Sequence, residues 1–243
     1  MKDILQDIVA HTHSLGFLPL VKITGDDKST VIESMADDRS VIVNAVAHNP
    51  VVEFKGTFGM PNLDKLNLHL KNPEYKENAK INVVEAERNG ANVPTGLHFE
   101  NQAGDFQNDY RFMNAEIINE KLKSVKFKGA SWEVEFEPSL SSIQRLKLQA
   151  EAHSEESVFQ VRTDNGNLVI FFGDAASHAG SFVFQPNVGG KLKHTWAWPV
   201  TQVRSILNLG GKITMKIADA GAMQITVDSG IAEYNYILPA QSK

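Results

Sequence analysis

Hydrophobic and polar residues alternate over most of the chain, in short segments that end at Gly, Asn or Asp. A period of two in segments rich in Val, Ile, Phe and Tyr predicts β-strands with one buried face. The clearest case is the pair of segments around Asn165-Gly166, because Asn-Gly accepts the positive φ angles of a tight hairpin turn. The segments that predict strands are 29–36, 39–47, 79–87, 95–102, 110–118, 132–138, 157–162, 167–173, 180–186, 193–199, 212–218, 222–228 and 232–238.

Four other segments carry apolar residues at the spacing of an α-helix. Leu63, Leu66 and Leu70 are typical, because residues three or four apart share one face of a helix. Proline stands at or near the first turn of three of these segments, where its missing N–H costs nothing. The predicted helices span residues 2–14, 61–72, 139–154 and 199–209.

The order of these elements repeats along the chain. Each half begins with a helix, continues with strands, and then has a short helix followed by three strands. Lys80-Ile81 in the first half corresponds to Lys212-Ile213 in the second. A repeat of pattern and order predicts two tandem domains of one topology. We expect an N-terminal domain at 1–114, a connector at 115–128 and a C-terminal domain at 129–243.

Composition is ordinary for a globular protein and excludes few classes. The chain has 243 residues, is 42% hydrophobic, and contains no cysteine, which excludes disulfides and thiolate metal sites. No apolar run approaches the ~18 residues that span a bilayer, and the N-terminus lacks the pattern of a signal peptide. We therefore expect no membrane partner.

The net charge is −5, yet the basic residues gather on the predicted helices. On helical wheels, Lys65 and Arg145 hold equivalent positions opposite the apolar stripe, with Lys71 and Lys147 nearer its edge. The acidic pairs lie in turns and strands instead. Local field rather than net charge sets phosphate attraction, so these helix faces are candidates to face DNA. The full candidate set is Lys2, Lys65, Lys71, Arg145, Lys147 and Arg204. The alternative is an ordinary solvated helix face.

Motifs for catalysis or metal binding do not stand out. The segment 25–30, GDDKST, lacks the glycine that a phosphate loop needs before its lysine. His11 and His13 would point to different sides of a helix, which is poor metal geometry. Paired acids lie in polar turns, and no hydrolase or metalloprotease motif occurs. We expect a protein without catalysis, metal or cofactor.

The chain resembles the DNA sliding clamps, the ring-shaped processivity factors of replication, and is most similar to the clamp of T4-like bacteriophages. The resemblance rests on the duplicated element order, the length, and the segments 136–174 and 198–240. It implies an α+β fold of two tandem clamp domains, with helices on one face of antiparallel sheets. Three chains would close head to tail into a homotrimeric ring, with edge strands near 108–113 and 181–186 at the subunit contacts.

The same resemblance implies a function and partners. The ring would encircle duplex DNA without sequence preference and tether a DNA polymerase, and an ATP-dependent clamp loader would place it there. The setting would be the cytoplasm of an infected bacterium. Partner peptides would dock in an apolar pocket made by the connector and the C-terminal strand. The candidate pocket residues are Ile117, Ile118, Leu122, Tyr236, Ile237, Leu238 and Pro239.

Two other functions also fit a β-rich chain. One is a phage structural protein of the tail or baseplate type, which would not need basic helix faces. The other is a carbohydrate-binding domain that stacks sugars on Trp132, Trp196 or Trp198.

Overall fold

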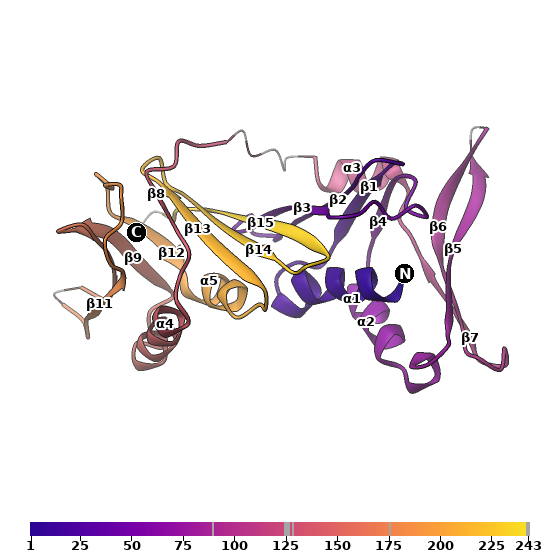
Figure 1. The fold of residues 1–243 in the computed structure, drawn as a ribbon, viewed down its shortest axis with the longest axis horizontal. Coiled ribbons are helices and arrows are strands. Elements are labelled where there is room, and N and C mark those ends of the chain that lie inside the picture. The colour runs from indigo at the N-terminus through magenta and orange to yellow at the C-terminus, as the bar shows by residue number, and fades with distance from the viewer. Residues whose placement is uncertain (89, 124–126, 128, 175, 242–243) are drawn as a thin grey trace. The chain divides into compact units, whose positions relative to one another are not determined.

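The computed structural model describes residues 1–88, 90–123, 127, 129–174 and 176–241. The chain forms two compact units (Figure 1). The first unit comprises Met1–Lys126 and Ser229–Tyr234, and the second comprises Phe127–Asp228 and Asn235–Lys243. The expected domain boundaries at residues 114 and 129 stay a prediction, because these units are defined by packing alone.

The first unit has two antiparallel groups of strands. The order in one is β4-β1-β2-β3, and in the other β5-β6-β7. Its elements are α1 Lys2–His11, β1 Val21–Gly25, β2 Thr30–Met35, β3 Ile42–Ala47, β4 Gly56–Met60, α2 Leu63–Lys71, β5 Lys80–Arg88, β6 Ala91–Glu100, β7 Gln107–Arg111 and α3 Ala115–Lys121, with short 3₁₀ turns at His13–Leu15 and Pro73–Tyr75.

Helices α1 and α2 pack against each other and lie on one side of strands β1 to β4, while α3 lies on the other side (Figure 1). The apolar stripes predicted from sequence are the buried sides of both helices. Ile8 of α1 and Leu66 of α2 are completely buried. Each fully buried aliphatic side chain stabilises the unit by roughly 1.5–3 kcal/mol, so this packing places the polar side of each helix outward.

The second unit repeats the plan. A sheet with the order β11-β10-β9-β12 stands beside strands ordered β15-β14-β13-β8, and α4 packs against α5. Ser139 caps α4, since its Oγ accepts a hydrogen bond of 3.0 Å from Ser142 N. The elements are β8 Val134–Phe136, α4 Leu140–Ala152, β9 Val158–Asp164, β10 Asn167–Phe172, β11 Gly180–Gln185, β12 Trp196–Pro199, α5 Val200–Leu207, β13 Lys212–Ala218, β14 Ala222–Asp228 and β15 Ala232–Pro239.

Strand β15 begins in the first unit and ends in the second. Next to it, His48 N donates to Ile231 O at 2.9 Å, which attaches the segment Ser229–Tyr234 alongside the end of β3. The sequence repeat did not indicate that this segment leaves its own half of the chain.

One predicted strand is wrong in its second part. The segment 110–118 is a strand only up to Arg111, and helix α3 begins at Ala115. Asn114 starts this helix, because its side chain accepts a hydrogen bond of 2.9 Å from Ile117 N. Strands β1 and β4 were missed: each is only five residues long, and β4 contains Gly56 and Gly59.

Candidate DNA-facing helices and partner sites

The exposed side of α2 carries two lysines. Lys65 and Lys71 are exposed, while Leu63, Leu66 and Leu70 are buried. One side of α2 therefore packs on the protein, and the opposite side exposes the two lysines. A helix that contacts phosphates weakly needs such a charged, exposed face.

Histidine 69 shares this part of α2 but adds little charge. Its pKa lies below the ordinary value of 6.5, first because partial burial disfavours the charged ring and second because Lys65 repels it. His69 is consequently neutral at pH 7, and the positive charge of this helix face comes from the two lysines.

We expect Lys65→Ala to raise the pKa of His69, because the substitution removes the repelling charge and leaves most of the burial. Proton NMR titration of the ring would measure this. Lys121→Ala, on α3, is the matched control and should leave the titration unchanged. A His69 pKa that did not move in Lys65→Ala would show that burial alone lowers it.

Arginine 145 lies differently from Lys65, although the two hold equivalent positions on their helices. Its Nη1 donates to the Val183 carbonyl at 3.3 Å, and its guanidinium stands 5.2 Å from the centre of the Phe182 ring. Both partners belong to β11. The side chain is thus drawn toward the edge of a sheet while it stays exposed, as Lys147 on the same helix does.

The other two candidates for DNA contact, Lys2 and Arg204, have less exposed side chains. Lys2 Nζ donates to the backbone carbonyls of Tyr75 and Lys76, at 2.7 and 3.2 Å. It therefore ties the start of α1 to the turn after α2, and part of its charge is used there. Arg204, in the last turn of α5, is half-buried.

Two of the connector residues lie on α3 and the third, Leu122, directly follows it. Ile118 and Leu122 are buried, and Leu20, Met35, Ile42 and Met113 pack against them. Gly59 allows this close approach, because a Cβ built there would lie 2.9 Å from the Ile118 side chain. Ile117 points outward with 46% of its surface exposed, so it is the connector residue that a partner could reach.

The C-terminal residues of the predicted pocket are mostly inside the second unit. Tyr236, Ile237 and Leu238 are buried, and Pro239 is exposed. Trp198 Nε1 donates to the Leu238 carbonyl at 3.1 Å. Docking of a partner peptide on these residues stays a prediction.

Trp196 and Trp198 do not form an open platform. Trp198 is completely buried, and Trp196 is half-buried with its Nε1 bonded to the Asp219 carbonyl at 2.9 Å. Sugar stacking needs an exposed ring face, so Trp198 is unsuitable for it.

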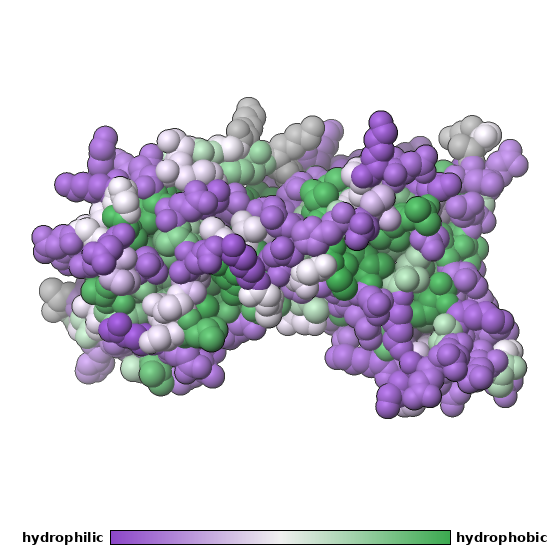
Figure 2. Space-filling view, viewed as in Figure 1, coloured by the Kyte–Doolittle hydropathy of each residue, from purple (hydrophilic) through white to green (hydrophobic). Residues whose placement is uncertain are grey.

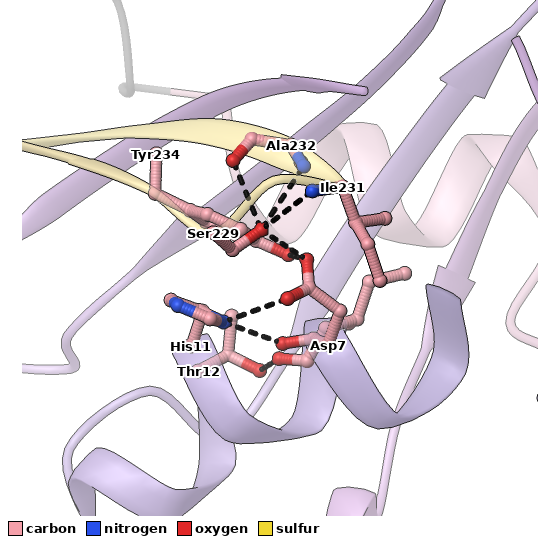
Figure 3. Close-up of polar contacts among 8 residues, drawn as sticks. Asp7, His11, Thr12, Ser229, Ile231, Ala232 and Tyr234 are labelled. Carbon is pink, nitrogen blue, oxygen red and sulfur yellow. Dashed lines mark hydrogen bonds and ion pairs between the residues drawn. The ribbon is translucent and has the colours of Figure 1, made fainter. Parts of the chain in front are cut away.

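Sequence reasoning missed a polar cluster centred on Asp7 (Figure 3). Asp7 is only 9% exposed, and its Oδ2 accepts hydrogen bonds from Tyr234 OH at 2.8 Å and from Ser229 Oγ at 3.1 Å. The His11 ring stacks on Tyr234, with Nδ1 3.2 Å from Asp7 Oδ1. The cluster joins α1 to the segment Ser229–Tyr234. The sequence feature that could have indicated this cluster is Asp7 itself, an aspartate between the apolar residues Ile4 and Ile8.

Each of two sheets ends in a strand with one neighbour. In the described part of the chain, β5 and β7 are the two edges of one sheet, and β11 and β12 are the two edges of the other. Free strand edges are templates for pairing with another chain. In the view of Figure 2, mostly hydrophilic residues cover the surface of each unit, interrupted by hydrophobic areas.

Among the described residues, no helix is long and apolar enough to cross a membrane. Nor do three or more His, Asp or Glu side chains of the described ranges come close enough to hold a metal ion.

No protein-family model and no curated protein matches the chain, but solved structures do. A structure described as the C-terminal region of FEN-1 bound to A. fulgidus PCNA superposes with a TM-score of 0.68 at 12% identity, over 100% of this chain and 95% of that one. PCNA from Thermococcus kodakaraensis gives a TM-score of 0.66 at 11% identity, over 98% and 96% of the two chains.

The chain has the PCNA-type sliding-clamp fold. The expected fold class is confirmed, since mixed α+β architecture, antiparallel sheets and few helices match over the whole length. At this identity the likeness concerns the fold. In the clamp fold of this chain, α1 with α2 and α4 with α5 are the two helix pairs that carry the candidate basic residues.

Proposed function

We propose that the protein is a sliding clamp, a non-catalytic processivity factor that encircles duplex DNA and tethers a DNA polymerase. The observation that carries this proposal is the full-length likeness to two PCNA structures. Exposed Lys65, Lys71 and Lys147 on the paired helices support it, because phosphate contacts without base readout give the weak attraction that permits sliding.

The proposal includes a homotrimeric ring, an ATP-dependent loader, and a closest relationship to T4-like phage clamps acting in the cytoplasm of an infected bacterium. A ring contact that runs head to tail uses two different surfaces of each chain. The edge strands β7 and β11 overlap the two segments expected at that contact, 108–113 and 181–186.

The decisive experiment is primer extension on a long single-stranded template with the matching polymerase and loader. A processivity clamp should lengthen the products made in one binding event. Negative-stain imaging should show rings. Neither result is expected of a baseplate protein or a carbohydrate-binding domain, and a protein that is monomeric at micromolar concentration would contradict the proposal.

We expect Lys65→Glu with Lys71→Glu to shorten the retention of the clamp on nicked circular DNA and to leave assembly intact. The slope of log affinity against log salt should become shallower by about one for each phosphate that the variant no longer neutralises. Lys121→Glu is the matched control, because this exposed lysine lies on α3, on the other side of strands β1 to β4. Equal effects of both variants would mean that α2 does not face DNA.

A further inference from the structure

The ring of His69 lies beside Lys65 on α2 and has its nitrogens free. The two residues are four positions apart, so their side chains share one face of the helix. Among the described residues, no group makes a hydrogen bond to either ring nitrogen of His69. The ring is half-buried, so part of it is open to solvent. An imidazole in this position can bind a group that arrives from outside.

The packed side of the ring is held in place by the core. The ring centre of His69 lies 5.2 Å from that of Phe99 on β6, at an interplanar angle of 32°. Phe99 is completely buried and also contacts the Tyr75 ring, at 5.4 Å. A ring packed on one side has little freedom to turn away, and its open part stays next to Lys65.

The groups around His69 provide no carboxylate partner for a charged ring. The elements that pack against α2 are α1, β7 and the 3₁₀ turn that follows it. Their titratable groups toward α2 are Lys2, which donates to the Tyr75 carbonyl, and the phenols of Tyr75 and Tyr110. Asp64 of α2 acts on the pKa of Tyr110, while the charge that acts on the pKa of His69 is that of Lys65.

We propose that a DNA phosphate binds between Lys65 and His69, that the imidazole takes up a proton from water as it does so, and that the protein therefore holds duplex DNA more tightly below neutral pH. The proposal rests on the proposed function, because it concerns regulation of the same helix face. A protonated ring donates a charge-assisted hydrogen bond to a phosphate oxygen, and the anion between them offsets the repulsion between the ring and Lys65.

The direction of the pH effect follows from the two states of His69. In the free protein its pKa lies below 6.5, first because of burial and second because of Lys65. A bound phosphate raises this pKa, since a negative charge favours the imidazolium. Between the two pKa values the complex carries more protons than the free protein, so affinity rises as the pH falls and levels off below the pKa of the free ring. Each unit of the rise is worth up to about tenfold in affinity.

The first test measures binding of short duplex DNA at low salt by fluorescence anisotropy, between about pH 5.5 and 8. We expect the affinity of wild type to rise about three- to tenfold more over this range than that of His69→Gln. His98→Gln is the matched control and should behave as wild type. His98 precedes Phe99 on β6, so it points to the opposite face of the sheet, where it bonds Asp109.

Two further measurements do not depend on the packing of the glutamine variant. His69→Lys, which is charged throughout this range, should bind DNA at pH 8 about as tightly as wild type does at the acidic end. In wild type, proton NMR should show a higher pKa of the His69 ring with duplex DNA than without it. Calorimetry in two buffers with different heats of ionisation should register the uptake of protons.

The possible failures distinguish this proposal from the proposed function. A wild type that loses affinity in Lys65→Glu with Lys71→Glu, but shows the same pH dependence as His69→Gln and an unchanged His69 pKa with DNA, refutes the proton uptake and keeps the clamp. A wild type that neither binds duplex DNA nor assembles refutes both.

Discussion

Replacing Trp198 with alanine is expected to lower the free energy of unfolding of the second unit by about 3–5 kcal/mol, the usual cost of deleting a large buried aromatic side chain. Trp198 is completely buried in β12, where it pairs with Phe159 of β9. The variant also removes the indole N–H that bonds the Leu238 carbonyl at 3.1 Å, so the end of β15 loses an attachment.

Urea denaturation followed by circular dichroism at one fixed protein concentration would measure this change, because assembly makes the apparent stability depend on concentration. Trp196→Ala is the matched control. That side chain lies on the same strand but is only half-buried, and its removal should cost less than half as much. Equal destabilisation by the two variants would contradict the assignment of Trp198 to the core.

The second large effect is expected from Asp7→Ala, which should destabilise the first unit by roughly 2–4 kcal/mol. The substitution removes the carboxylate that accepts hydrogen bonds from Tyr234 OH and Ser229 Oγ. Buried donors that lose their acceptor bear the cost of desolvation. The segment Ser229–Tyr234 should then detach from α1 more readily.

Hydrogen exchange read by mass spectrometry would localise the effect. We expect faster exchange in residues 229–234 and in α1 of Asp7→Ala. Asp3→Ala is the matched control, because Asp3 is exposed on the same helix, and Asp7→Asn should be milder because its amide oxygen still accepts hydrogen bonds. Exchange that rose evenly over both units would argue against a local attachment.

Four helices could be predicted from the sequence because the helical spacing of their apolar residues is visible within a few consecutive turns. The three leucines of α2 mark its buried stripe, and α4 has Ser139 at the position of a helix cap. Each predicted helix ends within a few residues of the observed one, as fraying makes usual. The hairpin at Asn165-Gly166 was predicted for the same local reason, and both residues have positive φ angles.

Helix α3 could not be found by period alone. Its segment begins as an alternating pattern that continues β7, and only Asn114, a good cap residue, marks the change. The burial of Ile118 depends on Gly59, far away in the sequence, which leaves space for it. A connector was expected here, but a short helix docked on a sheet is a tertiary outcome.

The order of residues by itself determined the helix stripes, most strands and the duplicated plan, because backbone propensity and side-chain period act over a few neighbours. Only the tertiary structure determined which groups the polar side chains and strand edges contact. It brings Asp7 to partners 222 and 227 residues away, and it leaves β7 and β11 as sheet edges. It also turns Arg145 toward β11, although the helical period alone makes this residue the equivalent of Lys65, because the direction of a long side chain depends on which strand lies beside its helix.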